Sequence, residues 1–336
     1  GWNNINPSDV ESVSVLKDAA SNALYGAHEC PLFVAGNRPR TSYFEDIENL
    51  TVRDVTFYDA AFWTLHMAGC RNVMVDGVRI LNNDRGPNND GIDPDSCKNV
   101  VIRNCIIESG DDAIVVKSTK AMSEKYGSCE NVVIQGCILH TRDSALKIGT
   151  ESFGDIRNIL FCDCIVRDCS RAVGIWSRDG GVISDIQIRH VTGNTRRYAD
   201  CPEREFAPRW WGKGEPFFIS ATKRKGAAEI PGAIRNISVD HVRLTAESCL
   251  FMGGESYAPI ECVRMKDIVI QWKCQSRHMP GLFDEQPSHE IPCIYGRDAR
   301  DVRIQGEFSV DESLAQVIRE REILDHCTDF VVDGFR

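Results

Sequence analysis

The sequence predicts an all-β protein folded as a right-handed parallel β-helix, a solenoid of about ten coils. Two observations lead to this prediction. Ile and Val together number 58 against 14 Leu, and β-branched side chains favour strands over helices. One short pattern, Asn or Asp followed by an aliphatic residue, any residue and a second aliphatic residue, recurs ten times. Each copy alternates apolar and polar residues, as a strand with one buried face does.

The ten copies place the coils in order along the chain from about residue 30. Successive anchor residues are separated by 23, 27, 32, 27, 27, 51, 31, 34 and 28 residues, which is too far for hairpins and suits stacked parallel strands. The 51-residue gap contains an excursion, Arg196–Lys225, that we expect to be a binding loop. The anchors, which we expect to form stacked turns, are Asn49, Asn72, Asn99, Asn131, Asn158, Asp185, Asn236, Asp267, Asp301 and Asp329.

The cysteines follow the same repeat. The chain has 15 cysteines and no pair of CxxC motifs, so a zinc ribbon is not expected. We interpret them as free thiols stacked inside the solenoid, where they act as small hydrophobic residues. Disulfides between neighbouring coils are the alternative. Those in register with the anchors are Cys70, Cys97, Cys129 and Cys327, two residues before, and Cys105, Cys137 and Cys164, six residues after.

Both ends of the chain depart from the pattern. The segment INPSDVESVSVLKDAASNALYG, within residues 1–27, resembles the end of the plug domain of TonB-dependent receptors. We therefore expect residues 1–27 to be foreign to the solenoid and residues 28–336 to form one β-helix domain. Near the other end, Asp311–Cys327 is expected to form a short helix.

Composition excludes several classes of protein. Asp and Glu number 49 against 39 Lys and Arg, a formal net charge of -10, which argues against a nucleic-acid partner. No apolar run reaches the roughly 18 to 20 residues that span a bilayer. We expect a monomer that needs no metal or organic cofactor.

Acidic residues cluster on one predicted wall of the solenoid. Asp111 and Asp112 lie 12 and 13 residues after Asn99, and Asp143 lies 12 residues after Asn131. Asp90 lies 22 residues before Asp112, about one coil earlier, and Arg171 falls on the same wall. Coils stack about 4.8 Å apart, so these side chains should meet. Paired carboxylates suit glycosidic bond cleavage; a calcium site and a solvated acidic edge are the alternatives.

Three motifs in this order resemble glycoside hydrolase family 28, the polygalacturonase-like enzymes. They are FWTLH (Phe62–His66), NNDGIDPDSCKNV (Asn88–Val100) and SGDDAIVVKS (Ser109–Ser118). The resemblance implies an inverting hydrolase of a pectic or related polysaccharide or oligosaccharide. It makes Asp111 the general acid, Asp90 and Asp112 the residues that activate water, and Asn88 a supporting residue. Members are often secreted or periplasmic, so either location is favoured here.

Two further motifs of the family are replaced. Asp143 stands where the family has the histidine of Gly-His-Gly, and Gly174-Ile175-Trp176 replaces Arg-Ile-Lys, whose cations hold the galacturonate carboxylate. A different glycan or linkage is therefore favoured. Lys147 or Arg178 supplies positive charge nearby, whereas an indole stacks on a neutral sugar face. The expected substrate-binding residues are Asn88, Asp143, Lys147, Trp176, Arg178, Trp210 and Trp211.

Two rival functions remain open. One is a non-catalytic carbohydrate-binding β-helix. The other is a calcium-dependent polysaccharide lyase, with Lys117 or Lys147 as its base. Of the neighbouring residues, Asp93 is expected to bond the backbone of the loop after Asp90.

Overall fold

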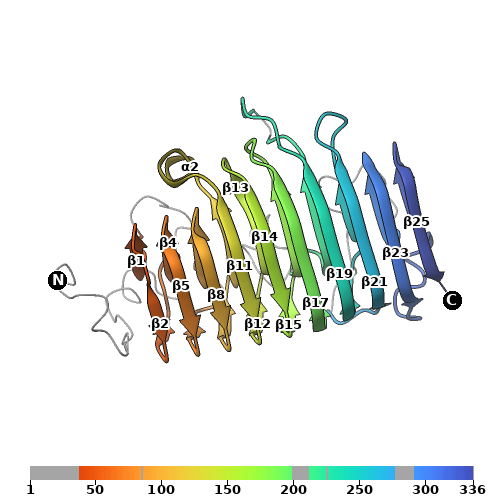
Figure 1. Cartoon of the computed structure of the whole chain (residues 1–336). Helices are drawn as coiled ribbons and strands as arrows, with labels where there is room; N and C mark the ends of the chain where they lie inside the picture. Colours follow the sequence, from red (N-terminus) through yellow and green to blue (C-terminus); the bar gives the residue numbers. More distant parts are fainter. Residues whose placement is uncertain (1–37, 85, 199–211, 225, 277–290, 336) are drawn as a thin grey trace.

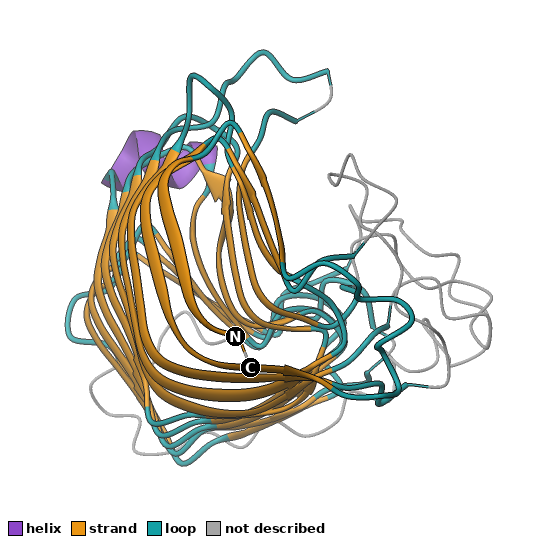
Figure 2. Cartoon of the chain, turned by 90° about the vertical axis from the view of Figure 1, so that its right-hand side faces the viewer, coloured by secondary structure: helices purple, strands orange, loops and turns teal. Residues whose placement is uncertain are grey.

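The computed structural model describes residues 38–335 except 85, 199–211, 225 and 277–290. Parallel strands stack coil upon coil along one axis (Figure 1), and the coils superpose when viewed along that axis (Figure 2). The predicted right-handed parallel β-helix is confirmed, with ten coils in the described residues. Residues 1–27, with the plug-like segment, and residues 199–211, with Trp210 and Trp211, lie outside the described residues, so the expected excursion Arg196–Lys225 is described only in part.

One ten-stranded sheet forms the wall that carries the site. Its strands pair in parallel and follow chain order, one from each coil. They are β1 (Ser42–Glu45), β4 (Leu65–Ala68), β7 (Ile92–Asp95), β10 (Ile114–Ser118), β13 (Ser144–Ser152), β16 (Arg171–Ser177), β18 (Glu215–Ala221), β20 (Leu250–Gly253), β22 (Ile294–Arg297) and β24 (Glu322–Asp325).

A fifteen-stranded sheet forms the other two walls and bends at each corner of the coil. In the first five coils it has two short strands per coil: β2 (Thr51–Arg53), β3 (Thr56–Tyr58), β5 (Arg71–Asp76), β6 (Arg79–Leu81), β8 (Lys98–Arg103), β9 (Ile106–Ser109), β11 (Cys129–Gln135), β12 (Ile138–Thr141), β14 (Ile156–Cys162) and β15 (Ile165–Cys169). In the last five, each pair merges into one long strand: β17 (Ile183–Thr195), β19 (Ile234–Ala246), β21 (Ile260–Trp272), β23 (Ala299–Val310) and β25 (Thr328–Phe335).

Successive side chains along each strand point alternately into the core and out from the solenoid, and the site lies on the outer face. In β10, Ile114 and Val116 are fully buried in the apolar interior, whereas Val115 and Lys117 point to the outer face. The register aligns Ile114 with Leu146 on the next coil, so like side chains stack inside the solenoid. Burying each such aliphatic side chain is worth about 1.5–3 kcal/mol.

The anchor asparagines form a hydrogen-bonded ladder along one corner. The Nδ2 of Asn72 donates to Oδ1 of Asn49 at 3.2 Å, and Asn99, Asn131 and Asn158 repeat this bond at 3.1, 2.9 and 2.7 Å. All have positive φ, between 54° and 64°, which Asn tolerates better than most residues. The repeat thus comes from one turn that every coil must make.

One anchor was assigned to the wrong corner. Strand pairing aligns Val263 with Ile237 and Ile268 with Val242, so Cys262 follows Asn236 in the ladder and Asp267 belongs to the next corner with His241. Cys262 also has positive φ, 54°. The prediction failed because both corners of a coil use residues with positive φ. On this coil the ladder corner holds Cys262, and the acid, Asp267, lies at the next corner.

The described cysteines are all free thiols. Cys70, Cys97 and Cys129 are fully buried, and Cys105, Cys137 and Cys164 form a second interior row. Cys327 in the last coil is only half-buried. This supports the interpretation that these thiols pack as small hydrophobic residues.

The predicted helix over Asp311–Cys327 is wrong. This segment forms consecutive turns, with Leu314 and Val317 each donating to the carbonyl three residues earlier, and residues 322–325 belong to β24. The end of the segment is extended because β24 pairs with β22 and completes the ten-stranded sheet. The described helix is α2 (Lys120–Tyr126), which follows β10 and ends at Gly127 with φ 78°. None of the described helices is long and apolar enough to cross a membrane.

Candidate active site

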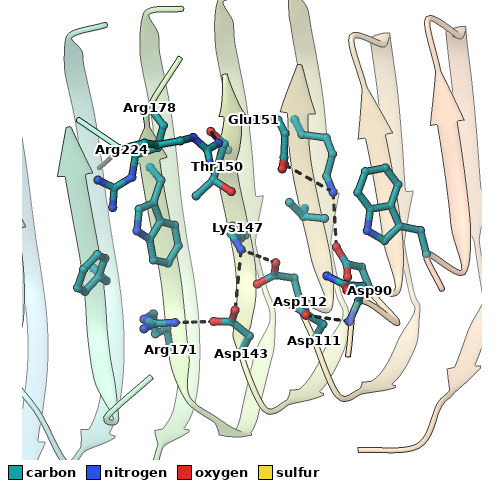
Figure 3. A pocket seen from close by; sticks show the side chains of 17 residues that line it. Asp90, Asp111, Asp112, Asp143, Lys147, Thr150, Glu151, Arg171, Arg178 and Arg224 are labelled. Atoms are coloured by element: carbon teal, nitrogen blue, oxygen red, sulfur yellow. Dashed lines mark hydrogen bonds and ion pairs between the residues drawn. The ribbon is translucent and has the colours of Figure 1, made fainter. Parts of the chain in front are cut away.

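A cavity of about 450 Å³ opens on the outer face of the ten-stranded sheet, between the coils of β4 and β18 (Figure 3). Acidic, basic and aromatic side chains from successive coils line it. The acids are Asp90, Asp111, Asp112, Asp143 and Glu151, the cations are Lys117, Lys147, Arg171, Arg178 and Arg224, and the aromatic residues are Trp63, Trp176 and Phe218.

Three buried carboxylates meet at the centre of this cavity. Asp90 precedes β7, and Asp111 and Asp112 precede β10, one coil later. One oxygen from each lies within 4.8 Å of the others. Burial, together with the neighbouring acids, raises the pKa of Asp111 and of Asp112 to about 7, and it raises the pKa of Asp90 well above its usual range. The cluster therefore holds protons at mildly acidic pH.

Local sequence explains how these loops are held. The Oδ1 of Asn89 accepts the backbone N–H groups of Gly110 at 2.8 Å and Asp111 at 3.1 Å. The backbone N–H of Asn88 donates to Oδ2 of Asp111 at 3.0 Å. A Cβ on Gly110 would lie 2.5 Å from a backbone carbonyl oxygen of Gly86. The Asn-Asn-Asp and Gly-Asp-Asp segments therefore lock together across neighbouring coils.

Asp143 links two cations on one side of the cluster. Lys147 donates to Oδ2 of Asp112 at 2.7 Å and lies 3.8 Å from Asp143. Arg171 donates to Oδ1 of Asp143 at 2.5 Å and lies 3.5 Å from Glu215. Burial would lower the pKa of Lys147, but Asp112, Asp143 and Asp111 outweigh it and raise that pKa. Lys147 is therefore a permanent cation beside Asp112.

Lys117 occupies the other side of the cluster. Its ammonium lies 2.9 Å from Oδ1 of Asp93, 3.5 Å from Oδ2 of Asp90 and 4.0 Å from Glu151. The expectation that Asp93 bonds a loop backbone is wrong, because its carboxylate pairs with Lys117 instead. Asp93 is fully buried on β7, and a buried carboxylate requires such a partner.

Aromatic side chains form the two ends of the cavity. Trp176 folds over Gly174, where a Cβ would lie 2.1 Å from the indole, and stacks on Phe218 with ring centroids 5.0 Å apart. At the other end, Trp63 packs edge-on against His66 at 4.9 Å. The glycine of the Gly174-Ile175-Trp176 segment thus makes room for the indole.

Several lining residues escaped the sequence prediction. Trp63 lay inside the quoted FWTLH motif, so a signal for it existed. Arg224 comes from the coil of β18 and binds Asp179 through Nε and Nη2, both at 2.9 Å; nothing in its local sequence marks it. Arg178 lines the cavity and donates to the carbonyl of Thr222 at 2.6 Å.

The central carboxylates fit a divalent cation poorly. Lys147 already bonds Asp112, and Lys117 already lies beside Asp90. A divalent ion between these groups would sit against two ammonium charges and be repelled.

Comparisons with known proteins find one family of similar sequences. The family model for glycosyl hydrolases family 28 matches residues 28–194. A probable polygalacturonase of Vitis vinifera is 29% identical over 165 residues, covering 47% of this chain and 32% of that protein. A probable polygalacturonase of Arabidopsis thaliana is 24% identical over 247 residues, covering 69% and 49%. The chain thus spans half or less of the length of these relatives.

Solved structures share the fold. An exopolygalacturonase from Thermotoga maritima superposes with a TM-score of 0.52 at 21% identity, covering 86% of this chain and 55% of that one. A family 28 exopolygalacturonase from Yersinia enterocolitica superposes with a TM-score of 0.61 at 16% identity, covering 85% of this chain and 46% of that one. The fold is that of the polygalacturonase-like β-helix proteins. Over residues 28–194 the chain is thus similar to glycosyl hydrolases family 28, and the curated relatives named above are probable polygalacturonases.

Proposed function

We propose that the protein is an inverting glycoside hydrolase that cleaves O-glycosidic bonds of a pectic or related polysaccharide. The observation that carries the proposal is the meeting of Asp90, Asp111 and Asp112 in a cavity, with oxygens within 4.8 Å of one another. Glycoside hydrolysis needs one carboxyl group that donates a proton and another that activates water. A solenoid has no structural need for three buried like charges.

The contacts with cations support one assignment of the roles. The Lys147 ammonium, 2.7 Å from Asp112, favours the charged form of that carboxylate. The pKa values of Asp111 and Asp112 are both raised to about 7, which suits a general acid at mildly acidic pH, and the Lys147 contact with Asp112 makes Asp111 the one that we assign as this acid. Asp111 protonates the leaving oxygen, while Asp90 and Asp112 take a proton from the attacking water. Asn88 supports Asp111 through its backbone N–H.

The stereochemical course rests on the family resemblance. Inverting enzymes generally hold their carboxyl groups roughly 6.5–9.5 Å apart, whereas the closest oxygens here lie within 4.8 Å. Proton NMR of the first product decides the point. Inversion gives a product of the opposite anomeric configuration to the bond cleaved, and a retained configuration would assign one carboxylate as a nucleophile.

The substrate we propose carries acidic sugars. Five cations line the cavity, and Lys147, Arg178 and Arg224 stand near the position from which the Arg-Ile-Lys pair is missing. Trp176 is only 7% exposed, so it offers little surface on which a neutral sugar could stack. Initial rates on galacturonate-containing and neutral glycans of equal length test this choice; faster cleavage of the neutral glycan would overturn it.

The lyase alternative needs an unprotonated basic residue. Burial alone would lower the pKa values of Lys117 and Lys147, but the neighbouring carboxylates outweigh it and raise both. Both side chains therefore stay protonated and do not serve as bases. A lyase releases an unsaturated product that absorbs in the ultraviolet, so reducing ends released without such absorbance support hydrolysis. Glycan binding without any release would instead support the binding module.

A further inference from the structure

Lys117 is the most enclosed cation of the site and has no role in the chemistry described above. It lies on the outward face of β10, between the coils that carry Asp90 and Glu151. Its side chain is 3% exposed. The ammonium lies 3.6 Å from the centroid of the Trp63 ring, so an aromatic face covers it from the side of the first motif.

We propose that Lys117 is a positioning residue, whose ammonium holds the Asp90 carboxylate in place and favours its charged form, in which Asp90 accepts the proton of the attacking water. This inference rests on the proposed hydrolase function. Lys117 lies 3.5 Å from Oδ2 of Asp90, while Oδ1 of Asp90 is buried without a hydrogen-bond partner. The lone pairs of that oxygen are therefore not used by hydrogen bonds within the protein and can accept a proton.

The groups around Asp90 show why this cation matters. Asp93 from β7 and Asp112 from the loop before β10 oppose the charge on Asp90, and the pKa of Asp111 in turn is raised by Asp90. Lys117 from β10 and Lys147 from β13 favour that charge. Lys147 is already hydrogen-bonded to Asp112. Lys117 therefore opposes burial and the two nearby acids, which favour the protonated form of Asp90 that cannot act as a base.

Asp93 and Glu151 also lie near the ammonium of Lys117 and compete with Asp90 for it. Asp93 takes the shortest contact, 2.9 Å, and Glu151 the longest, 4.0 Å. A purely structural role would have Lys117 neutralise the buried Asp93 and leave Asp90 unaffected. The two roles differ in what removal of each partner does to the titration of Asp90.

The test compares Lys117→Met with Asp93→Asn in pH profiles of kcat/KM and kcat. In Lys117→Met the acidic limb should move to higher pH by about one unit or more, with kcat at pH 5 falling at least tenfold and KM changing little. In Asp93→Asn, which frees Lys117 for Asp90, the acidic limb should move to lower pH. Lys117→Arg should restore part of the wild-type profile. Lys120→Met, an exposed lysine on α2, is the control and should change nothing.

Unchanged positions of the acidic limb in both variants would overturn the proposal, even if their rates or stabilities fall. A second readout does not depend on turnover. The carboxyl ¹³C resonance of Asp90, assigned by its loss in Asp90→Asn, should titrate at higher pH in Lys117→Met and at lower pH in Asp93→Asn. If the wild-type chain released no sugar, the hydrolase proposal would fail, while this titration would still decide the role of Lys117.

Discussion

The asparagine ladder and the carboxylate cluster are built by the same stacking of coils, but they have opposite effects on the energy of the fold. Both place like side chains on successive coils in register. In the ladder each amide donates to the one before it, from Asn72 at 3.2 Å to Asn158 at 2.7 Å. In the cluster, three carboxylates converge in the interior of a cavity, and their pKa values are raised by burial and mutual repulsion.

The difference lies in the chemistry of the two groups. An amide is both donor and acceptor, so a row of amides satisfies itself. An ionised carboxylate only accepts, so a row of acids needs cations or protons from outside. Lys117, Lys147 and Arg171 supply that charge from neighbouring coils. The ladder is thus expected to contribute stability, and the cluster to contribute chemistry at a cost in stability.

The largest effect should come from Asp90→Asn. We expect the rate of sugar release to fall by about 10²- to 10⁴-fold, the usual contribution of one acid–base group. The free energy of unfolding should stay within about 1 kcal/mol of wild type or rise, because a buried like charge is removed. Initial-rate assays and urea denaturation measure the two quantities. A large loss of stability with unchanged activity would mean that the carboxylate cluster stabilises the fold, as the asparagine ladder does, and does not contribute to catalysis.

The pH dependence of stability should show the cost of the cluster. The folded-state pKa values of Asp111 and Asp112, about 7, lie above the usual 3.8, so the native state binds protons more tightly than the unfolded chain. Their stabilising contribution is therefore full below about pH 4 and is lost as the pH rises through about 7. Each unit of pKa difference corresponds to about 1.4 kcal/mol.

Urea denaturation at pH 5 and pH 8 measures this loss, with the Asp111→Asn, Asp112→Asn double variant as the control. The wild type should lose more stability between the two pH values than the control does. An equal loss in both proteins would show that ionising Asp111 and Asp112 costs no folding stability.

The ladder should respond in stability alone. In Asn99→Ala, two side-chain hydrogen bonds are lost and Ala must adopt φ 58°. We expect a cost of about 1–2 kcal/mol and unchanged sugar release. Asn99→Gly keeps the backbone conformation accessible and should cost less than Asn99→Ala. Thermal unfolding compares them; equal costs would mean that positive φ contributes nothing.

The smallest effect should be a gain. Cys262 interrupts the ladder between Asn236 and Asp301, and its φ is 54°. Cys262→Asn restores the residue type that suits this corner and should raise the free energy of unfolding by about 0.5–1 kcal/mol. A loss of stability at this position would show that the ladder needs an apolar side chain on the eighth coil.

The sequence predicts those parts of the molecule that repeat. The coils, the amide ladder and the convergence of Asp90, Asp111, Asp112 and Asp143 all follow from spacing, since register fixes which residues meet. Arg224 and Phe218 were missed because they lie within the longest gap, between Asp185 and Asn236, where counting from an anchor loses the register. The partner of Asp93 was missed because strand spacing does not reveal which way a lysine side chain bends.

The most direct test of the account is reducing-end release by the chain on pectic and neutral polysaccharides, with Asp111→Asn measured alongside. We predict release from an acidic pectic glycan at mildly acidic pH, a loss of about 10²- to 10⁴-fold in the variant, and unchanged unfolding temperature. Equal and negligible release from both folded proteins, with glycan still bound, would contradict hydrolysis and leave the carboxylate cluster as part of a binding surface.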